Sequence, residues 1–210
     1  CLPSYLHAGA AIQCLRAGKA VLVEKPVALK AADAKRMLDA ARKAKQPLMV
    51  AHVLKFSAEF ALLSEAVKSQ RWGELRALHP RRLIAMAIWG DSGWFGDRKL
   101  SGGMVVDLHI HDADFVRWCF GDPLTVSSVG TLDHLTTSYS FANGPDLVIA
   151  EGGWGHAPGW DFRMRYVVNF ENATADFDLT RDPKLLLSRE GKQESIPLAD
   201  STGYDGEIRH

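Results

Sequence analysis

The sequence lacks the features that mark secreted and membrane proteins. Its 210 residues include only three cysteines, Cys1, Cys14 and Cys119, an odd number with no pair at metal-ligand spacing. Free thiols of this kind are typical of a reducing compartment, so we predict a cytoplasmic location. No apolar run approaches the roughly 18–20 residues that a membrane span needs, and no secretory signal is recognisable. We therefore expect no membrane partner.

The sequence also lacks an excess of charge of either sign. Lysine plus arginine and aspartate plus glutamate both number 25, so the formal net charge is zero. Without a basic excess we expect no nucleic-acid partner. Hydrophobic residues make up 47% and charged residues 24% of the chain, a mixture typical of globular domains that bury a core.

The first part of the chain alternates between helical and strand patterns. An amphipathic pattern begins at Pro3 and ends at Gly18, and a second covers Lys30 to Lys45. Short apolar runs follow them at Ala20 to Val23 and at Pro47 to Val53. Helix, strand, helix, strand predicts right-handed crossovers and a parallel sheet. We place the end of this first domain near residue 54.

The remaining residues, 55–210, predict an α+β domain. We expect helices over Ser57–Gln70, with Ser57 as N-cap, and over Gly103–Phe120, and a long strand from Glu74 to Trp89 followed by a glycine-rich loop to Gly103. Hairpin turns and alternating residues predict further strands at 124–132, 136–142, 146–154, 161–170, 174–179 and 184–188. Strands joined by short turns favour a large, mostly antiparallel sheet.

A charged pair follows directly on the first predicted strand. Glu24 and Lys25 precede Pro26, which holds Lys25 in an extended conformation. Ligands of open parallel sheets bind at the carboxyl ends of the strands, so this pair is placed at the expected crevice. The alternative is an ordinary surface ion pair before a helix.

A second constellation lies in the predicted helix Gly103–Phe120. On one helix Asp107 and His111 are four residues apart and share a face, which Asp114 also joins. A carboxylate beside an imidazole raises its basicity and orients the ring, so His111 is a candidate general base. The alternative is a helix face with a salt bridge. His109 points elsewhere on such a helix, to the core or to an interface.

Other candidate ligands have simpler interpretations. A metal site made of Asp107, His109, His111 and Asp114 is the alternative, but on a helix the two histidines diverge and no cysteine pair or other histidine cluster completes a shell, so we predict no metal site. Trp94 and Phe95 lie in the glycine-rich loop with Trp89. Their aromatic rings could line a sugar-binding pocket, and the alternative is that the loop packs on the sheet. The lone histidines are assigned structural roles: His7, His52, His79, His134 and His156.

Taken in order, these motifs resemble the glucose–fructose oxidoreductase, inositol dehydrogenase and rhizopine catabolism (Gfo/Idh/MocA) family. The residues that carry the resemblance are Leu-Pro-Ser-Tyr-Leu-His at the start, Ala-Gly-Lys-Ala-Val-Leu-Val-Glu-Lys-Pro, Gly73-Glu74-Leu75 and Gly-Gly-x-x-x-Asp-x-x-x-His. The resemblance implies that residues 1–54 are the C-terminal part of a Rossmann-type dinucleotide-binding domain. Residues 55–210 would bind substrate and form oligomers.

The resemblance also implies a mechanism, in which NAD or NADP accepts a hydride from a hydroxyl of a sugar, polyol or sugar derivative. Lys25 would contact the reacting hydroxyl, Asp107 would orient His111, and His111 would take the proton. Asp114, with Trp94 and Phe95, would bind the rest of the substrate. The residues implied to lie beside the cofactor are Glu24, Pro26, Pro3 and His7.

The chain departs from the family pattern at its start. The phosphate-binding Gly-x-Gly-x-x-Gly turn is absent. We expect about 80–90 preceding residues to be missing, given the usual size of a dinucleotide domain. The last residues, 204–210, resemble the start of the family's final helix. By itself the chain is therefore expected to be inactive.

Two alternatives to a dehydrogenase stay open. The chain could be a non-catalytic domain that binds a ligand or oligomerises through its sheet, as a homodimer or homotetramer. The alternation of Phe162, Met164, Tyr166, Val168 and Phe170 would suit such a face. A metal-dependent hydrolase that uses Asp107, His109 and His111 is the weaker alternative.

Overall fold

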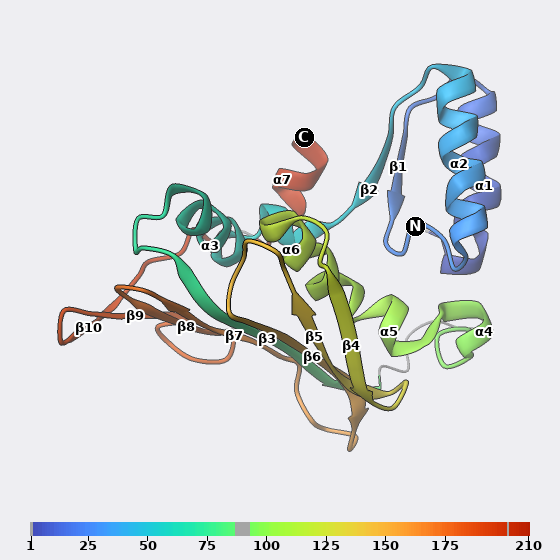
Figure 1. Ribbon diagram of the computed structural model, residues 1–210. Helices are drawn as coiled ribbons and strands as arrows, with labels where there is room; N and C mark the ends of the chain where they lie inside the picture. The colour runs from blue at the N-terminus through green and yellow to red at the C-terminus, as the bar shows by residue number, and fades with distance from the viewer. Residues whose placement is uncertain (1, 87–92, 201) are drawn as a thin grey trace.

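The computed structural model describes residues 2–86, 93–200 and 202–210 of the chain. These residues form a small parallel sheet backed by two helices and a large sheet with helices on one face (Figure 1). The expected fold class is confirmed: a remnant of a Rossmann-type parallel sheet is followed by an α+β domain with a mostly antiparallel open sheet.

The small sheet consists of two parallel strands. Its elements in chain order are η1 (Ser4–Leu6), α1 (His7–Arg16), β1 (Val21–Glu24), α2 (Ala31–Ala44) and β2 (Leu48–Ala51). Figure 1 shows α1 and α2 side by side, away from the large sheet. Ala11, Val23 and Met37 form the core between helices and strands, and Met37 is completely buried. This apolar face fixes the direction of β1, and hence the place where its carboxyl end emerges.

The large sheet has eight strands in the order β10-β9-β8-β7-β3-β6-β5-β4. The pair β3 and β6 is parallel and the other neighbouring pairs are antiparallel. The remaining elements are η2 (Val53–Phe56), α3 (Ala58–Ser69), β3 (Leu75–Ala85), α4 (Arg98–Ser101), α5 (Gly103–Asp107), α6 (Ile110–Phe120), β4 (Thr125–Gly130), β5 (His134–Ser140), β6 (Leu147–His156), β7 (Arg163–Phe170), β8 (Thr174–Asp178), β9 (Leu185–Arg189), β10 (Lys192–Ser195) and α7 (Tyr204–Arg209).

Helices α3 and α6 cover one face of this sheet and bury the main core. The ring of Phe60 on α3 lies 4.8 Å from that of Phe115 on α6 and 5.5 Å from that of Tyr166 on β7, both edge to face. Tyr166 also donates a hydrogen bond to the backbone oxygen of Glu59 (2.9 Å). These contacts hold α6, which carries His111, at a fixed position over the sheet.

The expectation that the apolar residues of 161–170 form an interface is wrong. Met164, Tyr166, Val168 and Phe170 point toward the helices and are buried in the core, and Phe162 packs against it. A period of two identifies which residues share a face, but it does not say which face another layer covers.

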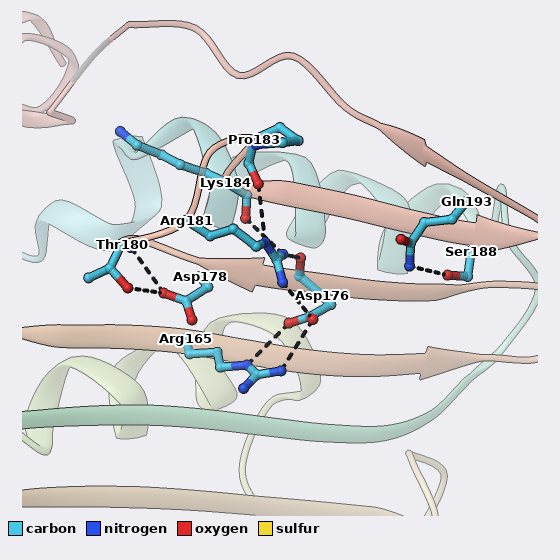
Figure 2. Close-up of polar contacts among 9 residues, drawn as sticks. All are labelled: Arg165, Asp176, Asp178, Thr180, Arg181, Pro183, Lys184, Ser188 and Gln193. Carbon is cyan, nitrogen blue, oxygen red and sulfur yellow. Dashed lines mark hydrogen bonds and ion pairs between the residues drawn. The ribbon is translucent and has the colours of Figure 1, made fainter.

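The opposite face of the large sheet carries charged side chains and no helix among the described residues. Figure 2 shows Asp176 on β8 accepting hydrogen bonds from Arg165 on β7 and from Arg181. Arg81 on β3 donates to Glu151 on β6 (2.6 Å), which also contacts His134 on β5. Ion pairs therefore connect strands across this open face.

The six strands expected after residue 124 are confirmed within two residues at each end, while β10 was missed. The single helix expected over Gly103–Phe120 is wrong, because α5 and α6 are separated at Leu108 and His109. Ser57 is at the N-cap of α3 as expected, but its hydroxyl contacts the backbone oxygen of Val53 rather than capping the helix. Trp89 lies outside the described residues.

Candidate active site

The turn after β1 presents Glu24 and Lys25 at the carboxyl end of the small sheet. A carboxylate oxygen of Glu24 accepts a hydrogen bond from the backbone N–H of Lys25 (3.2 Å). The backbone oxygen of Pro26 lies 2.8 Å from Nδ1 of the buried His7, whose Nε2 is 2.9 Å from the backbone oxygen of Leu2. His7 therefore ties the start of the chain to this turn.

Pro3 has a structural role at the start of the chain. It immediately precedes η1, and its backbone oxygen accepts a hydrogen bond from the N–H of Leu6 (2.9 Å). Of the four residues expected beside the cofactor, His7 contacts Pro26 directly and lines a common cavity with Glu24, while no such contact is seen for Pro3 among the described residues.

Lys25 reaches across to the large domain and contacts Asp107 twice. Its ammonium nitrogen is 2.7 Å from Oδ1 of Asp107 and 2.7 Å from the backbone oxygen of the same residue. In a continuous helix that backbone oxygen would accept from the N–H of His111. Here the N–H of His111 bonds to the backbone oxygen of Leu108 instead. Lys25 thus occupies the position at which α5 ends.

The break between α5 and α6 changes the expected relation between Asp107 and His111. Among the described residues no hydrogen bond joins the two side chains, and the Nδ1 atom of His111 is enclosed without a partner. The expectation that Asp107 orients His111 is therefore wrong for this arrangement, since the carboxylate is held by Lys25.

The imidazole of His111 is held in its neutral form. Burial lowers the pKa of His111 well below its usual value, and the positive charges of Arg82, Lys25 and His52 lower it further. A neutral imidazole can accept a proton, which a general base must do. The electrostatics of the site thus favour the base form of His111 even without a carboxylate partner.

Asp114 lies on α6 with His111, as the spacing predicted, and Lys55 and His52 are its neighbours. Its Oδ1 is 3.2 Å from the ammonium nitrogen of Lys55 and 3.7 Å from Nε2 of His52. Its Oδ2 is enclosed and has no hydrogen-bond partner. Burial lowers the pKa of His52, and the negative charge of Asp114 partly offsets that effect. Asp114 therefore lies one helical turn beyond His111 with one carboxylate oxygen held by Lys55 and the other enclosed.

Sequence reasoning missed His52 and Lys55. His52 is the first residue after β2, and Lys25 is the first residue after the neighbouring strand β1. Because the carboxyl ends of adjacent parallel strands meet at one edge, the position of His52 could have been noticed.

A cavity of about 490 Å³ lies beside Lys25, Asp107 and His111, but Asp114, His52 and Lys55 are not among its lining residues. It is lined by Lys25, Asp107 and His111 on one side and by the apolar side chains of Ile84, Phe95, Trp154 and Phe162 on another. A volume of this order and a mostly apolar lining with a few polar groups are usual for small-molecule sites. A second cavity of about 620 Å³ shares His111 with it and is also lined by residues 196–200 and by Thr202.

The two described aromatic residues of the glycine-rich loop, Trp94 and Phe95, differ in their relation to the cavity. Phe95 lines the cavity, with its ring 5.6 Å from that of Trp154 on β6. Trp94 packs edge to face on Phe95 (5.5 Å) and Tyr5 (6.4 Å) and is not part of the lining. Trp154 itself was not identified from the sequence. It continues the buried face of β6 after Val148, Ala150 and Gly152, and the pattern alone does not distinguish a core residue from a residue that lines a pocket.

His109 lies apart from the cavity, as expected. It is buried against β6, where a side chain on Gly152 would come within 2.8 Å of its Nδ1 atom. Its Nε2 is 3.0 Å from the hydroxyl of Thr137 on β5. In the described part of the chain, no group of three or more histidine, cysteine, aspartate or glutamate side chains could hold a metal ion.

Gly102 and Gly103 precede α5 with positive φ angles of 85° and 73°. A Cβ on Gly102 would lie 2.7 Å from Cβ of Val106 and 3.2 Å from a methyl group of Leu29, which follows the Lys25 turn. The two glycines therefore allow the close approach between the turn after β1 and the start of α5.

Comparisons with known proteins identify the family of the chain. Residues 1–52 match the family described as "Oxidoreductase family, NAD-binding Rossmann fold", and residues 60–176 match the "GFO/IDH/MocA C-terminal domain". The chain therefore belongs to the Gfo/Idh/MocA family of oxidoreductases, with an NAD-binding type of domain at its start.

Among curated relatives, the chain is 34% identical over 119 residues to a 1,5-anhydro-D-fructose reductase of Ensifer adhaerens. It is 30% identical over 122 residues to a myo-inositol 2-dehydrogenase of Thermotoga maritima. These matches cover 56% and 58% of this chain and 35% of each relative. The matched segment thus corresponds to about a third of the length of these relatives.

Solved structures show the same fold. A levoglucosan dehydrogenase in complex with NADH superposes with a TM-score of 0.79 at 21% identity, over 97% of this chain and 62% of that one. An aldose-aldose oxidoreductase from Caulobacter crescentus superposes with a TM-score of 0.83 at 21% identity, over 100% and 66%.

Proposed function

We propose that this chain forms the substrate-binding part of an NAD(P)-dependent dehydrogenase that acts on a hydroxyl of a sugar, polyol or sugar derivative. The observation that carries the proposal is the meeting of Lys25, Asp107 and His111 in one cavity at the carboxyl end of the small sheet. The first 54 residues would serve the cofactor, and residues 55–210 the substrate and the contacts between subunits.

The site fits a nicotinamide cofactor. The carboxyl ends of β1 and β2 open on the cavity, as expected for a dinucleotide-binding sheet. The flat walls of Phe95 and Trp154 and the unpartnered Nδ1 of His111 offer apolar and polar contacts there. Bound at this edge beside Glu24, Pro26, Pro3 and His7, the cofactor would supply a hydride acceptor.

Each side chain at the site has its own proposed role in binding the substrate or in transferring the proton. Lys25 donates a hydrogen bond to the reacting hydroxyl and eases the loss of its proton, while Asp107 holds the ammonium group in place. His111 takes the proton, a contribution worth about 10²–10⁴-fold in rate. Asp114, which lies one helical turn beyond His111 and outside the cavity lining, is proposed to bind a second hydroxyl. Phe95 packs against the ring carbons, supported from behind by Trp94.

We further propose that the protein is a cytoplasmic homo-oligomer that uses the open face of the large sheet. The interstrand ion pairs of Arg165 with Asp176 and of Arg81 with Glu151 lie on this face. Cys14 and Cys119 are both free thiols, which suits a reducing compartment. No described helix is long and apolar enough to cross a membrane.

The test is reduction of NAD⁺ or NADP⁺ by the enzyme that carries this chain at the full length of its relatives, with myo-inositol, glucose and levoglucosan as probes. We expect turnover to fall by about 10²–10⁴-fold in His111→Ala and to persist in His134→Ala, whose imidazole lies on the open face. Full turnover in His111→Ala would remove the proposal. A protein that binds no nicotinamide but oligomerises would support a non-catalytic sheet domain instead.

A further inference from the structure

A second cavity borders on the candidate active site. Its volume is about 620 Å³, compared with about 490 Å³ for the first cavity, which contains Lys25. Each volume by itself falls within the range usual for a small-molecule site. The residues that line both cavities are Val53, Leu108, His111, Phe162 and Tyr204. The two cavities therefore border on each other at His111, the residue proposed to take the proton.

Helix α7 fixes the position of Tyr204 at the boundary between the cavities. A Cβ atom on Gly206 would lie 3.0 Å from Cβ of Phe56, so this glycine lets α7 approach η2 closely. His210 follows α7, and its ring lies 5.4 Å from that of Phe56. The side chain of Tyr204 is 55% exposed, so on its side the boundary is open to water rather than closed by packed side chains. A ligand with two units can therefore extend past Tyr204 from one cavity to the other.

The second cavity has an apolar floor and a polar rim. Met164 on β7 and Phe177 on β8 are buried at the floor, whereas Lys184 and Asp200 at the rim are exposed. Asp200 belongs to the segment 196–200, and Figure 1 shows the chain after β10 returning toward α7. An apolar lining with a few polar groups is usual for sites that bind small molecules.

Lys184 offers a donor that no described residue uses. Among the described residues its ammonium group has no hydrogen bond or ion pair. Figure 2 shows its side chain extending away from the ion pair of Arg181 with Asp176, while its backbone oxygen accepts a hydrogen bond from Arg181 (3.2 Å). The ammonium group is therefore available to a ligand at the rim of the second cavity.

The polar groups of this cavity suit a neutral ligand better than an anion. Arg82 is the other cation among the lining residues, but Asp112 engages its guanidinium group through two hydrogen bonds of 3.1 Å. Lys184 is thus left with two carboxylates of the lining, those of Glu59 and Asp200. A phosphate group would be repelled by these carboxylates, whereas hydroxyl groups both donate to them and accept from the ammonium group.

We propose that the second cavity binds a second sugar unit, so that the substrate is a disaccharide or a similar glycoside rather than a single ring. The proposal rests on the proposed function, in which the reacting hydroxyl lies at Lys25 in the first cavity. The second ring packs on the apolar floor, and its hydroxyl groups contact Lys184 and Asp200 at the rim. A single ring would occupy one cavity and leave the other to water.

One isoleucine in each cavity allows the two sites to be observed separately. Ile84 lines the first cavity and not the second, and Ile196 lines the second and not the first. Ile149 on β6 lines neither cavity and serves as the reference. In the 210-residue chain with carbon-13 isoleucine methyl groups, NMR therefore reports which cavity a sugar enters, without cofactor.

The test is titration of this chain with cellobiose, maltose and lactose, and with glucose for comparison. At least one disaccharide should move the methyl signals of both Ile84 and Ile196 with a single dissociation constant, while Ile149 stays in place. Glucose should move Ile84 alone. We expect it to bind about tenfold more weakly, because it lacks one or two of the hydrogen bonds that the second ring makes.

Two variants at the rim test the polar contacts of the second ring. Lys184→Gln should weaken binding of the disaccharide about tenfold, as expected for loss of a hydrogen bond from a charged group, and should leave glucose binding unchanged. Its control is Lys192→Gln on the exposed β10, which should bind both sugars like the original protein. Asp200→Asn should act in the same way as Lys184→Gln, with Asp205→Asn on α7 as its control.

The proposal is overturned if none of the three disaccharides moves Ile196, if none binds more tightly than glucose, or if both rim variants bind the disaccharide as well as the original protein does. These outcomes are independent of the turnover test for the enzyme. A disaccharide that moves Ile196 in a protein without dehydrogenase activity would leave the second sugar site standing and remove the proposed function. Turnover that depends on His111, together with an unmoved Ile196, would do the reverse.

Discussion

The ammonium nitrogen of Lys25 lies 2.7 Å from both the carboxylate and the backbone oxygen of Asp107. These two contacts join the small parallel sheet to the helix that precedes His111. The side chains are only 19% and 17% exposed, so solvent screens their attraction less than it screens a surface pair. The pair therefore connects the stability of the domain junction with the electrostatics of the candidate site.

Replacing Lys25 with Met should change both properties. Loss of the ammonium group removes one of the charges that lower the pKa of His111, so that pKa should rise in an NMR titration. The free energy of unfolding should fall by about 1–3 kcal/mol in urea, because Asp107 loses a charged hydrogen bond. Lys35→Met is the control, since Lys35 forms an exposed pair with Asp39 on α2. An unchanged pKa of His111 would contradict the assignment.

Stability should decrease as the pH falls below neutrality. The native state holds the pKa of His111 well below its usual value, and burial also lowers the pKa of His52, His79 and His109. The unfolded chain therefore takes up protons from about pH 6.5 downward, while the native state takes them up only at lower pH. The free energy of unfolding falls across this window and is largest above it.

Urea titrations at pH 7.5 and pH 5.5 measure this effect; these two values bracket the usual pKa of histidine, about 6.5. His111→Gln should show a smaller difference between the two conditions than the original protein, because its contribution is gone. An equal difference in both proteins would show that His111 is not the depressed group.

Removing Asp112 should destabilise the fold strongly. Asp112 and Arg82 form a buried pair with two hydrogen bonds of 3.1 Å between α6 and β3. In Asp112→Ala the guanidinium group stays buried without its partner, so the free energy of unfolding should fall by about 3–5 kcal/mol. Asp122→Ala breaks the exposed pair with Arg117 and should cost at most about 1 kcal/mol.

The double variant Arg82→Met with Asp112→Leu tests the cause. It removes both charges together, so it should recover most of the stability lost in Asp112→Ala. If it is as unstable as the single variant, the loss comes from packing rather than from the unpaired charge.

Phe60→Ala should open a cavity at the centre of the main core. Phe60 is almost completely buried and contacts the rings of Phe115, Tyr166 and Phe177. The expected loss is about 3–5 kcal/mol in thermal or urea unfolding. Leu124→Ala, at an exposed position before β4, should change stability by less than about 0.5 kcal/mol. Similar losses in both variants would contradict the placement of the core.

Local patterns were sufficient to predict much of this fold. The strand that ends at Glu24 and the hairpins after residue 124 were predicted because a short apolar run or a pair of turn residues specifies the structure of its own segment. The face of β7 that the helices cover was not predicted. Apolar residues alternate in the same way whether they face helices or another subunit. Which face α3 and α6 cover depends on contacts such as Phe60 with Tyr166, which are over 100 residues apart in the sequence.

The residues of the site were predicted correctly in part, while their mutual contacts were not. Lys25, Asp107, His111 and Phe95 do line one cavity, but the helix that was expected to align Asp107 with His111 is interrupted. The spacing along 103–120 predicted one helix, but the backbone oxygen of Asp107 that a continuous helix would use is bound by the ammonium group of Lys25, 82 residues away in the sequence. Contacts of this kind cannot be inferred from spacing within one segment.

Lys25 acts as a helix terminator supplied by a distant part of the chain. Without a donor at this position, the backbone oxygen of Asp107 becomes available to the N–H of His111, and α5 and α6 can merge into one rod. Such a merger would rotate the imidazole relative to the cavity as well as remove a charge. Lys25→Met therefore alters shape and electrostatics together, whereas Lys25→Arg keeps donors for the backbone oxygen and changes mainly the group presented to a ligand.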